Sequence, residues 1–252
     1  MLLRHILIVL IMIVCYSLSI TDSLATTVIA VWTPTEIVLG ADSLVTDGGI
    51  QNSWTQCKMN SSNNIFWGES QILRVPSFNF SVDSIATEVM STNTNFRSKV
   101  EQFETSVIQK LTLIVNALKR GDEEYFRKEM EGKTALEIVF VTSEESTNKL
   151  SLRYFIANSD ASSGDVRLTT YRVDCPNFEC GNSRYISLGF HEKADMEVLS
   201  NTRIFEKGID VGVRQSIEQE IAANPTRVGA PISLLRIDKI GPSWLSTGVC
   251  AK

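Results

Sequence analysis

The chain has 252 residues, of which 43% are hydrophobic and 21% are charged, a composition that excludes a disordered or fibrous protein. The net charge of −5, without a run of basic residues, argues against a nucleic-acid partner. No Gly-, Pro- or Ser-rich linker, internal repeat or low-complexity block divides the sequence, so we expect one domain with a substantial core.

The first 25 residues have the pattern of a secretory signal peptide. Arg4 and His5 precede an unbroken apolar run from Ile6 to Tyr16, and Ser23-Leu24-Ala25 provides small residues where a signal peptidase reads them. The apolar run is short for a transmembrane helix. We therefore predict cleavage after Ala25, a mature domain over residues 26–252, and a secreted, periplasmic or lumenal location. An uncleaved membrane anchor is the alternative.

The rest of the chain predicts an α+β fold. Nearly continuous apolar residues indicate strands at 27–32 and 36–41 that are covered on both faces. Apolar residues at steps of three and four predict a long amphipathic helix over 96–118. Further elements are a short strand at 65–67, a short helix from Asp122 to about Met130, strands at 136–142, 150–157, 166–173 and 185–188, a helix that begins at Asp210 and stops before Pro225, and a closing strand at 232–237. Two antiparallel sheets with helices outside satisfy this order.

Four cysteines remain after the signal peptide. Cys175 and Cys180 bracket a short loop and are the obvious disulfide pair, which leaves Cys57 and Cys250 as a second pair. Metal ligation is the weaker alternative, because His191 is then the only histidine and Cys-x4-Cys is poor zinc spacing. We predict no metal.

Cleavage after Ala25 would give Thr26 both a hydroxyl and a free α-amine. A hydroxyl needs a base to become a nucleophile, and an α-amine with a pKa near 8 can serve as that base. This chemistry requires neither histidine nor a cofactor. It does require a nearby cation, which a lysine oriented by a carboxylate can provide.

The segment Thr26 to Val31, the segment Ile37 to Ser43, and Lys58 together resemble the start of a proteasome β subunit. In that family an aspartate follows the first threonine by 16 positions and a lysine follows it by 32, which matches Asp42 and Lys58 without a gap. The resemblance is specific over about residues 26–68. It implies the four-layer αββα sandwich of the N-terminal-nucleophile (Ntn) hydrolases, threonine-type peptidase chemistry, and assembly into a homo-oligomeric ring.

The sequence departs from the family at two supporting positions, and the family's Asp-Ser-x-Gly tract before the last helix has no clear counterpart. The glycine expected 14 residues after the lysine falls on Ile72, and the serine expected after a later strand falls near Phe190. Two hypotheses therefore stand: a threonine peptidase, or a secreted, catalytically silent member with a binding or assembly role. An exported peptidase would lack an ATP-driven unfoldase, so we expect short or unfolded peptides as substrates.

Purely structural roles for the three polar residues also remain open. Thr26 could simply begin a strand, Asp42 could be a turn carboxylate, and Lys58 could be a solvated surface lysine.

The resemblance also implies residues that receive the substrate side chain. In ungapped register these are Val45, Gln56 and Asn60, which are uncharged and favour neutral side chains of small or medium size. Asn60 and Asn79 each begin a glycosylation sequon. Because a glycan on Asn60 would obstruct this pocket, we predict that Asn60 is unmodified and that Asn79 is the glycosylated site if the source glycosylates.

Overall fold

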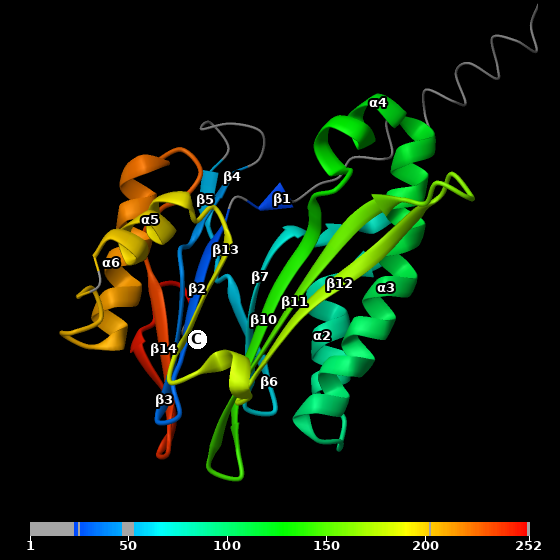
Figure 1. Ribbon diagram of the computed structural model, residues 1–252. Helices are drawn as coiled ribbons and strands as arrows, with labels where there is room; N and C mark the ends of the chain where they lie inside the picture. The colour runs from blue at the N-terminus through cyan, green and yellow to red at the C-terminus, as the bar shows by residue number, and fades with distance from the viewer. Residues whose placement is uncertain (1–22, 25, 47–52, 202, 251–252) are drawn as a thin grey trace, which may run out of the picture.

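The computed structural model describes residues 23–24, 26–46, 53–201 and 203–250 (Figure 1). Apart from Ser23 and Leu24, the predicted signal peptide, with its cleavage residue Ala25, lies outside these ranges. The described chain is a mixed α+β structure with two principal antiparallel sheets and several helices.

One sheet contains the start of the predicted mature domain. Its strand order is β13-β2-β3-β14-β15, and every neighbouring pair is antiparallel. The register places Val28 opposite Ala41 and Gly189 opposite Thr27. The strands are β2 (Thr27–Trp32), β3 (Glu36–Ala41), β13 (Arg184–Gly189), β14 (Ser233–Asp238) and β15 (Gly241–Ser246). The N-terminal strands therefore lie in the middle of this sheet, where both faces are covered.

The second sheet has the order β1-β7-β10-β11-β12, with β6 also paired to β7. Its strands are β1 (Ser23–Leu24), β6 (Met59–Ser62), β7 (Ile65–Ile72), β10 (Thr134–Glu144), β11 (Thr147–Ser159) and β12 (Val166–Cys175). Two small ribbons pair β4 (Leu44–Thr46) with β5 (Ser53–Thr55) and β8 (Arg74–Val75) with β9 (Phe80–Ser81).

The helices belong to two groups (Figure 1). The first contains α2 (Val82–Met90), α3 (Phe96–Gly121) and α4 (Glu123–Tyr125), which runs into a π turn at Phe126–Met130. The second contains α5 (Glu192–Ser200) and α6 (Ile209–Ala223). Side-chain caps begin α2 and α3, because Ser81 accepts a hydrogen bond from the Ser84 N–H and Asn95 accepts one from the Ser98 N–H. Two 3₁₀ turns at Pro76–Phe78 and Phe178–Cys180 complete the elements.

Three apolar clusters hold these elements together. The first lies between the α2–α3 pair and the second sheet, where Phe103 meets Phe140 edge to face with ring centroids 4.9 Å apart. The second fills the space between the two sheets and includes Leu39 and Val139. The third joins α6 to the first sheet, and Val213 is one of its members. Each sheet is thus packed against the other sheet on one face and against helices on the opposite face.

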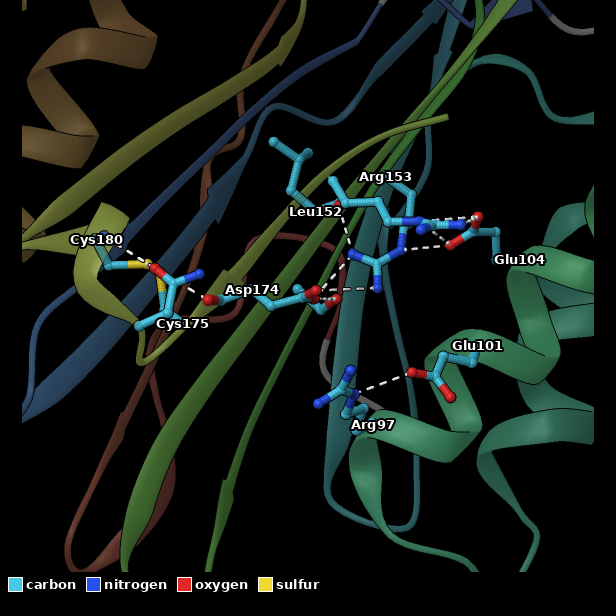
Figure 2. Close-up of polar contacts among 11 residues, drawn as sticks. Arg97, Glu101, Glu104, Leu152, Arg153, Asp174, Cys175 and Cys180 are labelled. Carbon is cyan, nitrogen blue, oxygen red and sulfur yellow. Dashed lines mark hydrogen bonds and ion pairs between the residues drawn. A yellow bond between two sulfur atoms is a disulfide. The ribbon is translucent and has the colours of Figure 1, made fainter. Parts of the chain in front are cut away.

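A buried ion network fixes α3 on the second sheet (Figure 2). The Arg153 guanidinium on β11 contacts Glu104 of α3 at 2.9 Å and Asp174 of β12 at 2.8 Å. The side chains of Arg153 and Glu104 are only 3% and 5% exposed, and each has a second ionic partner, Asp174 for Arg153 and Arg172 for Glu104, so both buried charges are compensated. Asp174 immediately precedes Cys175, and the network therefore also fixes the end of β12.

Both predicted cysteine pairs lie at disulfide distance. Cys175 and Cys180 close the short loop after β12, and Cys57 is joined to Cys250 across 193 positions of sequence. Disulfides are typical of oxidising compartments. Within the described ranges, no helix combines the length and the apolar character needed to cross a bilayer.

The main differences from the sequence prediction concern short or half-polar elements. Residues 27–32 and 36–41 form strands as predicted, whereas the strand predicted at 65–67 extends to Ile72. Helices α2 and α5 and strand β15 were not expected, because each is short and shows no long apolar period. The last helix is capped by Gly208 and contains Asp210 in its first turn, so Asp210 is not its cap.

Candidate active site

Thr26 lies immediately before β2, in the interior of the protein. It is 0% exposed, and its hydroxyl oxygen is among the buried polar atoms that have no hydrogen-bond partner in the described structure. Its carbonyl oxygen accepts a hydrogen bond of 2.8 Å from the N–H of Phe190. The backbone of Thr26 is therefore held in place while its hydroxyl is left without a hydrogen bond, an arrangement that is costly for a purely structural threonine.

Asp42 and Lys58 form a buried ion pair beside this strand. The Lys58 Nζ lies 2.9 Å from both carboxylate oxygens of Asp42, and Lys58 and Asp42 are 5% and 0% exposed. The Asp42 Oδ1 that binds Lys58 also accepts the backbone N–H of Thr27 at 2.8 Å. One carboxylate oxygen thus joins the lysine to the residue directly after Thr26, so neither charged residue is a solvated surface or turn residue.

The surroundings of Asp42 explain how its charge is held inside the protein. Its Oδ2 also accepts the backbone N–H groups of Leu44 and Gly229, each at 3.1 Å. Burial raises the pKa of Asp42, and the adjacent Lys58 opposes that rise. Burial likewise lowers the pKa of Lys58, and Asp42 opposes that fall. The pair stays inside because four donors converge on one carboxylate.

Gly189 allows β13 to approach the start of β2 very closely. Its φ is +75°, a backbone conformation that favours glycine. A β-carbon at this position would lie 1.9 Å from the Thr26 carbonyl oxygen and 3.3 Å from the Ser70 β-carbon. Gly189 therefore brings β7, β13 and the start of β2 together at one point.

A buried carboxylate stabilises the same junction from the second sheet. Glu137 of β10 accepts a 2.6 Å hydrogen bond from the Ser70 hydroxyl and a 2.7 Å hydrogen bond from the Gly189 N–H, both at Oε2. It is 7% exposed. Glu137 thus connects β10, β7 and β13 immediately beside Thr26.

The edge of β7 next to Thr26 is occupied in two places. β6 pairs with Ile65 to Gly68, and β1 pairs with Gln71 and Ile72, with Leu24 opposite Gln71. β10 pairs with the opposite edge of β7, so β6 and β1 share one edge and leave a gap at residues 69–70. Gln71 has a φ of +78°, which is rare for a residue other than glycine and is a feature that clusters at functional sites.

The predicted substrate-binding residues divide into two groups. Gln56 and Asn60, which flank Lys58 in the sequence, line a cleft of about 870 Å³ between β7 and α2. Val45 is fully buried in β4 and is not among the residues that line this cleft. The sequon asparagine Asn79 also lines it.

Several residues of the site were not found from sequence. These are Glu137, Ser70 and Gly229, which are brought to the site only by the fold. No motif in the sequence includes them, so they could not be recognised there. Gly189 could have been noticed, because a glycine directly after a predicted strand often has a positive φ. The four cysteines of the predicted mature domain form disulfides, and within the described residues no group of His, Cys, Asp or Glu side chains is arranged to hold a metal ion.

What this arrangement can do chemically follows from its three parts. A buried hydroxyl without a partner lies next to the residue whose N–H binds the Asp42–Lys58 pair, and Gln56 and Asn60, on either side of Lys58 in the sequence, line a nearby cleft. Such a hydroxyl can act as a nucleophile once a base is available and a substrate reaches it. No protein-family model matches the sequence, and no curated protein matches it significantly.

Proposed function

We propose that this chain is a secreted threonine-type Ntn hydrolase that cleaves peptide bonds, with the four-layer αββα architecture of a proteasome β subunit. The observation that carries the proposal is the shared oxygen of Asp42, which accepts both the Lys58 ammonium and the N–H of Thr27. This oxygen positions a buried cation beside the residue that would become the N-terminus. The packing of helices on the outer face of each sheet supports the architecture.

In the proposed reaction, the Thr26 hydroxyl oxygen attacks the carbonyl carbon of the scissile peptide bond. Its proton passes to the α-amine, which then transfers it to the departing amine of the substrate. Water hydrolyses the resulting ester and regenerates the hydroxyl. Lys58 provides positive charge that favours the neutral amine and stabilises developing negative charge, and Asp42 holds Lys58 in place.

Strand β1 supports a mode of substrate binding. Ser23 and Leu24 pair antiparallel with Ile72 and Gln71 immediately before the nucleophile. After removal of the leader, the residues that precede a scissile bond can occupy the same edge of β7 as an added strand. In the uncleaved chain this edge is filled, and Thr26 has no free amine, so processing and activity are coupled.

Of the two substituted positions, Ile72 is compatible with the proposal, whereas Phe190 favours the alternative. The backbone turns at Gln71 with a positive φ, so a glycine at Ile72 is not required to turn the chain there. Phe190, which stands at the family's serine, contributes only its backbone to Thr26. Loss of that serine favours the alternative of a catalytically silent protein, and activity must therefore be measured directly.

The test begins with the N-terminal residue of the purified secreted protein, determined by mass spectrometry, which we expect to be Thr26. Turnover of a library of short peptides is then compared among the parent, Thr26→Ser and Thr26→Ala. We expect reduced turnover in Thr26→Ser and none in Thr26→Ala, because the latter retains the fold and the amine but not the hydroxyl. Thr105→Ala, at an exposed threonine on α3, is the matched control and should retain full turnover. Undiminished turnover in Thr26→Ala would exclude the proposed nucleophile.

A further inference from the structure

The cleft lined by Gln56 and Asn60 has an acidic inner wall. Glu69 on β7 lines it and is only 7% exposed. Its Oε2 is one of the few buried polar atoms without a hydrogen-bond partner in the described parts of the chain. Asp83 of α2 lines the same cleft and is half-buried. Two neighbouring carboxyl groups, one buried and one half-buried, therefore line the cleft, and the Glu69 Oε2 has no donor in the described structure.

The basic residues of the cleft do not neutralise this wall. Arg74 on β8 and Lys110 on α3 line the cleft but are exposed, as is the third acidic residue, Glu88. Across the described residues, none of the ion pairs involves Glu69 or Asp83. The charges of the rim are thus mixed, whereas the buried end is acidic.

This arrangement is unfavourable unless something binds to it. A buried carboxyl oxygen without a partner loses its hydration without compensation. Burial raises the pKa of Glu69 to about 8, and the neighbouring Asp83 acts in the same direction. Burial also raises the pKa of Asp83. A cation with N–H donors would satisfy the free oxygen and reduce the repulsion between the two carboxyl groups.

The position of the acidic wall connects it to the nucleophile. Glu69 lies in the gap on the β7 edge between β6 and β1. Its neighbour Ser70 is beside Gly189 on the face toward the other sheet, so Glu69 projects from the opposite face, toward α2. Gln56 and Asn60, on either side of Lys58, line the same cleft. A peptide lying along the edge of β7 also alternates its side chains between the two faces, so a side chain on the helix-covered face would extend toward Glu69.

We propose that this cleft receives a lysine or arginine side chain of the substrate, whose ammonium or guanidinium group pairs with Glu69 and Asp83. This inference rests on the proposed peptidase function for the identity of the substrate. It replaces the preference for neutral side chains expected from Val45, Gln56 and Asn60, because Val45 does not line the cleft and Glu69 does. Gln56 and Asn60 remain as neutral residues of the wall.

A binding experiment tests the cleft without requiring catalysis. The processed Thr26→Ala protein is titrated with n-butylguanidinium and, separately, with neutral n-butanol, and binding is followed by NMR chemical shifts. We expect the cation to bind at least tenfold more tightly than the alcohol. Glu69→Gln should weaken cation binding at least tenfold and Asp83→Asn should weaken it to a smaller extent, whereas Glu218→Gln, at an exposed carboxylate on α6, should leave it unchanged. Equal binding of the two probes, or cation binding that survives in both Glu69→Gln and Asp83→Asn, would overturn the inference.

A turnover experiment separates this inference from the proposed function. The parent enzyme is given matched peptides that differ only in the residue before the scissile bond, with Lys, Arg, Leu or Glu at that position. We expect kcat/KM to be at least tenfold higher for Lys and Arg, and Glu69→Gln to remove that preference. Turnover of all four peptides at similar rates would contradict the inference and leave the peptidase function intact. Cation binding that depends on Glu69, with no peptide cleaved, would retain the cation site and exclude the peptidase function.

Discussion

Gly189 and Thr26 approach so closely that the Thr26 carbonyl oxygen lies 1.9 Å from the position a β-carbon on Gly189 would take. The contact joins two strands that are adjacent in the sheet but separated by about two thirds of the chain. It also positions Phe190, whose N–H binds the same carbonyl oxygen at 2.8 Å. The geometry at the start of β2 therefore depends on the absence of a side chain at residue 189.

Replacement of Gly189 by alanine tests this dependence. We expect Gly189→Ala to lower the free energy of unfolding by about 3 kcal/mol or more, because the new methyl group overlaps the backbone in addition to straining φ. Gly164 is a matched control, since it has the same φ of +75° and nothing within 4 Å of an added β-carbon. Gly164→Ala should cost only about 1 kcal/mol. Equal losses in urea denaturation would show that the close approach has no energetic role.

We expect the effects of substituting Asp42 and Lys58 on the free energy of unfolding to be strongly non-additive. Removing one partner leaves the other charge buried and unpaired, so Asp42→Asn and Lys58→Met should each cost about 3–5 kcal/mol. The double variant should cost less than the sum of the two, because it leaves no unpaired charge. Urea denaturation of the four proteins gives the coupling energy, with Lys239→Met at an exposed turn as the control. Single variants that cost less than about 1 kcal/mol would mean that the pair is solvated. All three site variants should lack peptidase activity.

Because Glu69 is buried, we expect its contribution to the free energy of unfolding to fall as the pH rises. Its pKa is about 8 in the folded protein, against 4.5 for an unperturbed glutamate, so folding favours the protonated form. This contribution is fully present below pH 4.5 and is lost as the pH rises to 8, by about 5 kcal/mol at most. Relative to Glu69→Gln, the parent should therefore become less stable across this interval, and Glu218→Gln should show no such difference from the parent. Parallel curves for parent and Glu69→Gln across the same interval would contradict the prediction.

The two disulfides should differ in their contribution to stability. Cys57–Cys250 closes a loop of 193 positions and Cys175–Cys180 closes one of 5. The chain-entropy model assigns about 5 kcal/mol to the longer loop and about 2 kcal/mol to the shorter. We expect the paired alanine variant of Cys57 and Cys250 to lose more stability in urea than that of Cys175 and Cys180. The opposite order would indicate that local packing of the small loop outweighs loop entropy.

The two sequons should be used differently in a source that glycosylates. Both asparagines line the cleft, but Asn79 is exposed at the end of a 3₁₀ turn, so a glycan there can extend into solvent, whereas Asn60 is partly buried in β6. We expect glycopeptide mass spectrometry to find a glycan on Asn79 and none on Asn60. Full occupancy of Asn60 with undiminished peptide turnover would show that the substrate does not use this cleft.

The sequence by itself determined the long, regular elements and the spacing of the candidate site. Strands 27–32 and 36–41 are nearly continuous in apolar residues, and the helix from Phe96 repeats them at steps of three and four. Such elements form wherever the core buries them. The cysteine pairs could also be predicted, because the short loop between Cys175 and Cys180 leaves only one partner for Cys57. Thr26 was identified from the predicted signal-peptide cleavage, and Asp42 and Lys58 from the resemblance to proteasome β subunits, although neither could show whether the side chains meet.

Only the tertiary structure decided which polar residues share the interior. Glu69, Asp83 and Glu137 come from three different elements, and nothing in their local sequence distinguishes a buried carboxylate from a solvated one. Short elements such as α2 and β15 were also missed, because they gain their stability from packing and not from their own periodicity. Burial, and with it the pKa of Glu69, is a property of the neighbours that folding brings together, so no pattern within one strand could have revealed it.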